Sequence, residues 1–178
     1  MKTIEEKLSE ILTTRRKPEM VRWVRRTPDS MPVLIRLASG DQGHLSWRAA
    51  WVLWDAMEPD DPRVIPHLSS MIKRLPSLPD NLIREWLMVM QRLTIPDKLE
   101  GRVFDFCLTV WEEIDKQPSV RLNALKLILK MAKHYPELIS ELGPVFEDRY
   151  TDTLTPGARR SFEIMTAPLL KKKLSGPG

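Results

Sequence analysis

Three tryptophans in one short segment are the side chains with the clearest capacity for ligand chemistry. Trp47, Trp51 and Trp54 are separated by four and three residues, so they share one face of a helix. Such rings could stack on a nucleobase or a cofactor. They could also pack against neighbouring helices, and burying aromatic rings stabilises a fold more than most contacts do. We interpret this face as a packing surface.

The histidines, the cysteine and the carboxylates do not form a recognisable catalytic or metal site. His44, His67 and His134 lie far apart and lack the spacing of a helical metal pair. Cys107 falls on an apolar helical stripe, where a free thiol acts as a small hydrophobic group. The sequence contains no glycine-rich phosphate loop and no GxSxG motif. We therefore predict a protein that is not an enzyme and that needs no metal and no cofactor.

Basic side chains offer a different chemistry, the attraction of an acidic partner. Four residues of segment 119–135 lie at steps of three, four and three, opposite the apolar face of that segment: Asn123, Lys126, Lys130 and Lys133. A second basic cluster lies near the N-terminus: Arg15, Arg16, Lys17, Arg22, Arg25 and Arg26. Each set is either an ordinary solvated face or a surface that attracts an acidic protein segment or a phosphate backbone. The predicted partner-binding residues are Arg84, Arg92, Asn123, Lys126, Lys130 and Lys133.

Composition limits the classes of protein that can carry these groups. The chain has 178 residues, of which 42% are apolar and 29% charged, which is the balance of a globular domain with a sizeable core. The longest uncharged run is Val64 to Ile72, too short to cross a bilayer. A single cysteine excludes internal disulfides. The first residues, MKTIEEKLSE, lack the apolar stretch of a secretion signal, so the expected location is the cytoplasm.

The elements that position these residues are predicted to be helices only. Helix interiors avoid proline, and the segments 46–57, 80–95, 97–117 and 119–135 contain none. Their apolar residues recur at steps of three and four, which is the period of an amphipathic helix. Two Asx/Thr–proline pairs predict helix starts, at Asp61-Pro62 and at Thr155-Pro156.

The predicted helices also repeat along the chain. Arg48, Arg84, Arg121 and Arg159 are separated by 36, 37 and 38 residues, and an apolar residue follows each arginine three positions later. These apolar residues should be mostly buried: Trp51, Leu87, Ala124 and Phe162. An amphipathic segment precedes each arginine-bearing helix, at 30–39, 62–75, 99–114 and 136–149. Four helix pairs at a period near 37 residues are typical of a solenoid.

These segments resemble HEAT repeats. WRAAWVL (47–53), IREWLMV (83–89) and VRLNALKLIL (120–129) are similar to the second helix of that repeat, and VIPHLSSMIKRL (64–75) to the first. Asp80 occupies the aspartate position of the HEAT pattern, whereas the other repeats carry His44, Gln117 and Thr155 there. The resemblance implies an all-α, right-handed superhelix of four to five helix pairs in one domain, 1–178. Within it, 1–29 would be an N-terminal helical cap, 30–173 four repeats and 174–178 a flexible tail.

The resemblance also implies a function. HEAT-like proteins commonly hold partners on the concave surface lined by the second helices, which predicts a non-enzymatic protein-interaction module with an acidic protein or peptide as partner. The alternative is a nucleic-acid-binding protein that resembles the HEAT-like alkylpurine DNA glycosylases. In that alternative Asp55, one turn after Trp51, and the neighbouring tryptophans would lie in a concave cleft.

Overall fold

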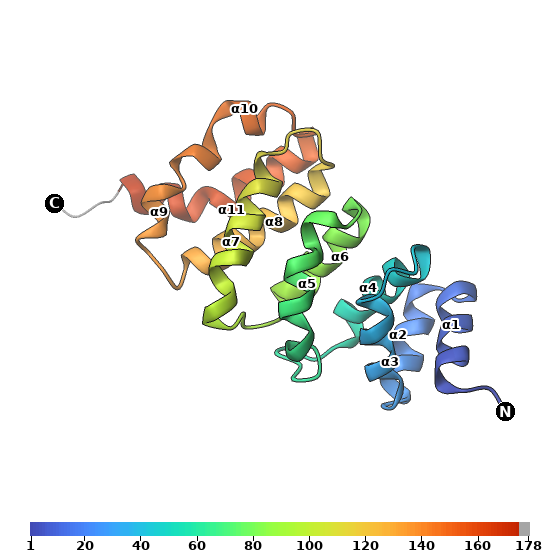
Figure 1. Cartoon of the computed structure of the whole chain (residues 1–178). Coiled ribbons are helices and arrows are strands. Elements are labelled where there is room, and N and C mark those ends of the chain that lie inside the picture. The colour runs from blue at the N-terminus through green and yellow to red at the C-terminus, as the bar shows by residue number, and fades with distance from the viewer. Residues whose placement is uncertain (175–178) are drawn as a thin grey trace. The chain divides into compact units, whose positions relative to one another are not determined.

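The computed structural model describes residues 1–174 and contains only helices there, without a strand (Figure 1). The chain divides into two compact units, Met1–Pro96 and the part from Asp97 onwards. The first unit contains α1 (Ile4–Thr14), α2 (Lys17–Arg26), α3 (Ser30–Ala38), α4 (His44–Ala56), α5 (Leu68–Arg74) and α6 (Asp80–Gln91). The second contains α7 (Asp97–Glu112), α8 (Pro118–Ala132), α9 (Leu138–Glu141), α10 (Asp148–Thr151) and α11 (Pro156–Leu174).

The all-α prediction is therefore confirmed for the described residues. The handedness of the superhelix and the single-domain boundaries stay predictions. The expected cap, 1–29, contains the two helices α1 and α2, and the predicted tail, 174–178, lies outside the described residues except for Leu174 at the end of α11.

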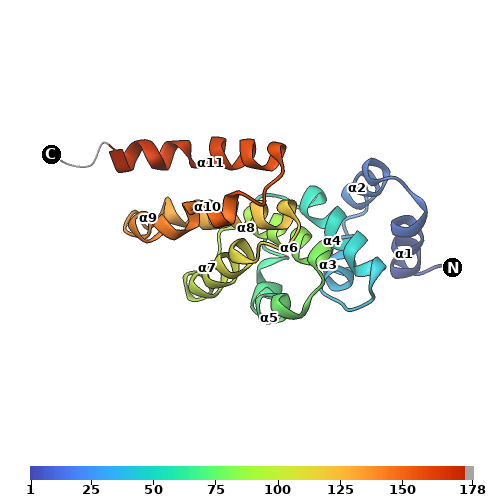
Figure 2. The ribbon, with the colours of Figure 1, turned by 90° about the horizontal axis from the view of Figure 1, so that it is seen from above.

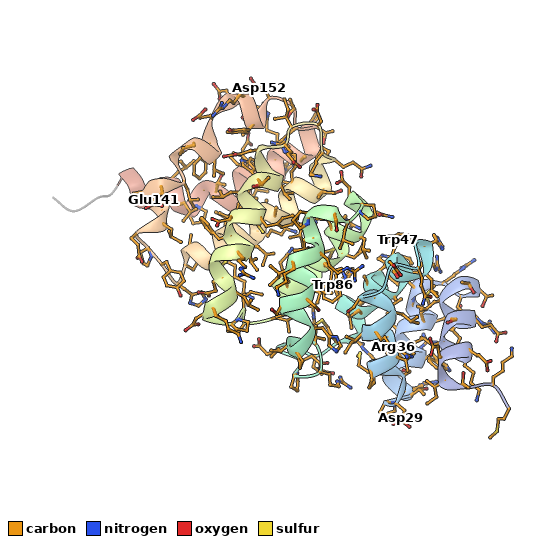
Figure 3. The ribbon with its side chains drawn as sticks, viewed as in Figure 1. Asp29, Arg36, Trp47, Trp86, Glu141 and Asp152 are labelled. Carbon is orange, nitrogen blue, oxygen red and sulfur yellow. The ribbon has the colours of Figure 1, made fainter. Side chains whose placement is uncertain are left out.

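The first unit is built around α4, which packs against α2, α3 and α6. A capping box at Thr3 and Glu6 fixes the start of α1, since each side chain bonds the other residue's backbone N–H. The centre of the core is Trp86 of α6, whose ring is fully buried and whose Nε1 donates a hydrogen bond to the carbonyl oxygen of Ala38 at 3.1 Å. Figure 3 shows Trp86 between the ribbons of this unit.

The predicted helix start at Asp61-Pro62 is wrong. The α-helix of this region begins at Leu68, after a short 3₁₀ turn at Ile65–His67. The carboxylate of Asp61 is completely buried and accepts bonds from the guanidinium of Arg63 at 2.7 and 2.8 Å. It also accepts from the backbone N–H groups of Glu58 and Arg63. Asp61 therefore closes a turn instead of capping a helix.

We expect the Asp61→Asn variant to lose about 2 kcal/mol of unfolding free energy at pH 7, because charge-assisted bonds in a buried site are worth about that much. The pKa of Asp61 lies below its ordinary value of 3.8, chiefly because Arg63 hydrogen-bonds the carboxylate. The stabilisation is therefore present above the ordinary pKa and is lost as pH falls through the lowered folded-state pKa. Urea unfolding of both proteins at pH 7 and at about pH 3 tests this. A difference in stability that does not shrink at the lower pH would contradict it.

The second unit is built on the pair α7 and α8, with α11 packed against α8. Trp111 of α7 is fully buried, donates from Nε1 to the carbonyl of Val145 at 3.1 Å, and stacks on Phe162 of α11 with 5.4 Å between ring centroids. Figure 2 shows α11 as a long helix at one side of this unit. Helix α11 begins at the predicted Thr155-Pro156 pair, because the Thr155 hydroxyl accepts a hydrogen bond from the backbone N–H of Ala158.

One predicted helix of this unit is broken. Segment 136–149 was expected to be continuous, but it forms two single turns, α9 and α10, separated by a 3₁₀ turn at Gly143–Phe146. Pro144 lacks an amide donor and cannot continue the helix from α9, and glycine before it weakens the helix further.

Arginines tie helix ends together in both units. The last carbonyl groups of an α-helix lack partners within the helix and carry partial negative charge, so a guanidinium satisfies them well. Arg48 donates to Leu12 and Arg15 at the end of α1, and Arg92 donates to Met57 at the end of α4. Arg74 donates to the carbonyls of Ser39 and Gly40 after α3, and Arg159 donates to Thr151 at the end of α10.

Candidate functional site

The polar stripe predicted on α8 divides into a buried and an exposed part. Asn123 is only 7% exposed, and its amide Nδ2 donates to the carbonyl of Ser119 at 2.8 Å. Lys126 and Lys133 are exposed, and Lys130 is half-buried. The exposed part of the stripe therefore consists of Lys126 and Lys133, with the half-buried Lys130 between them, while Asn123 stabilises the first turns of its own helix.

A hollow of about 390 Å³ lies beside Lys126, between α8 and α11. Apolar side chains from both helices line it, together with two hydroxyls, Asn123 and one ammonium group: Ser119, Leu122, Asn123, Lys126, Ser161, Ile164 and Met165. Ile164 is 66% exposed, whereas Phe162 two positions earlier is 8% exposed and packs on Trp111. The hollow thus combines uncovered apolar surface with positive charge.

Sequence reasoning missed Ile164, Leu122 and Met165. The apolar pattern of the helix that follows Thr155 could have indicated Ile164. Phe162 and Thr166 are buried at a spacing of four, which defines the packed face. Ile164 falls off that face and places a large apolar side chain on the polar side.

The other two predicted binding residues, Arg84 and Arg92, belong to the first unit and are engaged within it. The Nη1 of Arg84 donates to the carboxylate of Glu85 at 2.6 Å, and that buried carboxylate also accepts from Nε1 of Trp54 at 2.8 Å. Arg92 donates to Met57, as described above. Arg92 therefore links the ends of α6 and α4, whereas Arg84 compensates the charge of its own neighbour Glu85 in α6. Both engagements reduce the availability of these guanidinium groups to a partner.

The tryptophan face of α4 meets side chains of the chain itself. Trp47 and Trp51 stack on each other with 5.6 Å between centroids. The ammonium of Lys17 lies 3.5 Å from the ring centroid of Trp54 and 5.0 Å from that of Trp51, and 3.7 Å from a carboxylate oxygen of Asp55. Desolvation lowers the pKa of Lys17, although the field of Asp55 opposes this shift. These contacts support the packing interpretation over the stacking of a base.

The predicted repeat register is confirmed at three of its four positions. Leu87, Ala124 and Phe162 are buried. Trp51 is half-buried, and the flexible side chains of Lys17 and Arg48 cover part of its ring.

Cys107 and the possible metal ligands are the remaining candidates for chemistry. Cys107 is fully buried, and burial raises the pKa of its thiol far above the range in which a thiolate forms. Among residues 1–174 no three histidine, cysteine or carboxylate side chains are grouped so that they could hold a metal ion. None of the helices described is long and apolar enough to cross a bilayer.

Helix pairs repeated at about 36 residues define an α-solenoid repeat protein. The chain belongs to the HEAT repeat domain family, whose family model matches residues 4–166. The match includes α1 and α2, so the family extends over the segment predicted to be a separate cap. HEAT repeat domains are typically non-catalytic, and theirs is a fold of the kind that serves as a scaffold for protein interactions. Searches among curated proteins and among solved structures gave no match.

Proposed function

We propose that this chain is a non-enzymatic, cytoplasmic interaction module whose α8/α11 hollow binds an acidic peptide segment of a partner protein. The observation that supports this best is Ile164, a large apolar side chain left 66% exposed beside the ammonium of Lys126. Burying such a side chain is favourable by about 1.5–3 kcal/mol, so an uncovered one in a hollow is a suitable anchor.

The charge of the same surface selects the partner. Lys126 lines the hollow, and Lys130 and Lys133 follow it at steps of four and three on the same helix. Three positive charges on one helix face raise the local potential even though each exposed pair contributes little. A segment with aspartate or glutamate next to a leucine or phenylalanine would satisfy both parts of the hollow. Its binding should weaken with salt, since the charges are accessible to counterions.

The triple variant Lys126→Glu, Lys130→Glu and Lys133→Glu should weaken capture of such a peptide by about 30-fold or more, because three attractions of about 0.5 kcal/mol each become repulsions. The probe is a random peptide library displayed on phage and selected on the whole wild-type chain. Enriched peptides are then synthesised, and their dissociation constants are measured by fluorescence anisotropy. We expect enrichment of acidic residues with one large apolar residue.

The matched control carries the same change in net charge on exposed residues of the first unit: Lys2→Glu, Lys7→Glu and Lys73→Glu. It should keep its affinity for the selected peptides. Equal weakening in both variants, or undiminished capture by the folded α8 variant, would assign binding to another surface.

A second candidate is binding of nucleic acid, favoured by a basic hollow of about 470 Å³ on α2. Its lining includes three exposed arginines, Arg22, Arg25 and Arg26, next to Lys17 and Asp55. A gel shift with single-stranded and duplex oligonucleotides distinguishes the candidates, since phosphate binding falls steeply with salt concentration. Retarded bands at low salt that Arg22→Glu and Arg26→Glu remove would favour nucleic acid.

A further inference from the structure

A different pocket, of about 290 Å³, opens in the second unit where α7 meets the end of α8 and the start of α9. Four of its residues, Asp97, Glu100, Gly101 and Phe104, follow helical spacing and therefore share one face of α7. The opposite wall comes from α8 and the segment after it: Met131, Tyr135, Glu137 and Leu138. It is separate from the α8/α11 hollow, with which it shares no lining residue.

The walls of this pocket are apolar and accessible. Phe104 and Leu138 are half-buried, and Tyr135 is 37% exposed, while Met131 is buried and closes the floor. Rings left open in this way, above a thioether floor, can pack along a hydrocarbon chain.

The rim of the pocket is negative. Asp97, Glu100 and Glu137 supply three carboxylates, and no arginine, lysine or histidine is among the described lining residues. The hydroxyl of Tyr135 donates to a carboxylate oxygen of Glu100 at 2.6 Å. This hydrogen bond, together with the fields of Glu100, Asp97 and Glu137, raises the pKa of Tyr135, so the three carboxylates act on one point of the pocket.

Gly101 keeps the mouth of the pocket open. It lies inside α7 without a positive φ, where glycine weakens a helix relative to alanine. A Cβ added there would meet no atom within 4 Å, so neither backbone conformation nor close packing requires glycine at this position. A larger side chain would occupy the space that a ligand needs.

We propose that this pocket binds the arginine or lysine side chain of a basic peptide segment from a partner protein. The stem of such a side chain packs between Phe104 and Met131, and its cation meets the carboxylates at the rim. A cation over an aromatic ring gains a further attraction, and guanidinium is well suited to both contacts because it stacks on rings and bonds carboxylates through paired donors. An acidic segment would meet three like charges here, so the two surfaces of this unit select partners of opposite charge.

The test uses the whole ¹⁵N-labelled chain and the peptide acetyl-Leu-Arg-Leu-amide, followed by amide chemical shifts. The control peptide carries citrulline, which has nearly the shape of arginine without its charge. We expect shifts at Gly101, Phe104, Tyr135 and Leu138, and an affinity for the arginine peptide about tenfold or more above that for the citrulline peptide. Replacement of arginine by lysine should keep binding, and replacement by glutamate should abolish it.

The matched variants are Gly101→Leu and Gly157→Leu, since a Cβ at Gly157 also meets no atom within 4 Å. Gly101→Leu should fill the mouth of the pocket and abolish the peptide-induced chemical-shift changes, while its unfolding temperature equals or exceeds that of the wild type. Gly157→Leu should bind the peptide as the wild type does. Equal affinity for the arginine and citrulline peptides, or binding retained in Gly101→Leu, would overturn the proposal. Chemical-shift changes that appear without peptide, increase with protein concentration and vanish in Gly101→Leu would also overturn it. They would identify a second copy of this chain as the occupant of the pocket.

Discussion

Replacing Arg121 by methionine should lower the free energy of unfolding by about 3–5 kcal/mol, because buried acceptors lose a charged donor and each unsatisfied group costs about 1–3 kcal/mol. Arg121 is completely buried in α8. Its guanidinium donates to the carbonyls of Trp111 at 2.9 Å and Tyr150 at 2.6 Å, and to the hydroxyl of Thr153 at 3.0 Å. It also lies 4.7 Å from the ring centroid of Trp111. Methionine fills similar volume but leaves the carbonyls that end α7 and α10 without donors.

Urea unfolding of the full chain measures this loss. Arg121→Lys keeps the charge but cannot reach three acceptors from one planar group, so we expect most of the loss to remain. Arg160→Met, at an exposed position of α11, is the matched control and should change stability by less than about 0.5 kcal/mol. Since desolvation lowers the pKa of Arg121 without removing its charge near neutrality, the loss should be independent of pH between about 6 and 9. A loss below about 1 kcal/mol would show that water replaces the guanidinium without cost.

The Trp86→Ala variant should destabilise the chain by about 3–5 kcal/mol, because it opens a large cavity in the first unit. Trp86 is fully buried in α6 and donates a hydrogen bond to Ala38 of α3. Trp86→Phe separates the two contributions, since it retains much of the apolar volume and loses the hydrogen bond. We expect Trp86→Phe to cost about 1–3 kcal/mol, including the unsatisfied carbonyl.

Trp47→Ala is the control, because the same change at a half-buried ring creates little cavity. Thermal and urea unfolding should rank the three variants in the order Trp86→Ala, Trp86→Phe, Trp47→Ala. If Trp47→Ala proved as costly as Trp86→Ala, the core of this unit would lie on the tryptophan face of α4 instead of around α6.

Helices with regular apolar spacing were predictable from the sequence. Segment 119–135 corresponds closely to α8, since its apolar period and its proline boundary agree. Segment 30–39 corresponds to α3 through its apolar period, with Pro32 in the first turn of the helix. Segments 62–75 and 136–149 were less regular than predicted, because turns with local partners interrupt them. The carboxylate of Asp61 accepts hydrogen bonds from Arg63 instead of from the first N–H groups of a helix. Which of these partners it meets depends on how the turn is buried, and the residue type alone does not reveal it.

The candidate site was predictable only in part. The spacing of Lys126, Lys130 and Lys133 placed them on one face, whereas the burial of Asn123 depends on packing that spacing does not report. The arginine repeat was visible as a period. That Arg48 and Arg92 donate to carbonyls about 35 residues away was not visible, because backbone acceptors have no signature in the side-chain sequence.

These guanidinium bonds between helix ends have a consequence for how the chain comes apart. In a solenoid each helix pair touches its neighbours only, so the pairs could fray one after another from the ends. Arg48, Arg74 and Arg92 of the first unit each join residues 33–36 positions apart, which links one pair to the next. Opening one pair therefore leaves carbonyl groups or a guanidinium of the neighbouring pair without their hydrogen-bond partners. The free energy needed to open one pair then approaches the free energy needed to unfold the whole unit. Native-state hydrogen exchange should accordingly show the amides of α3, α4 and α6 exchanging through one cooperative opening instead of a gradient along the chain.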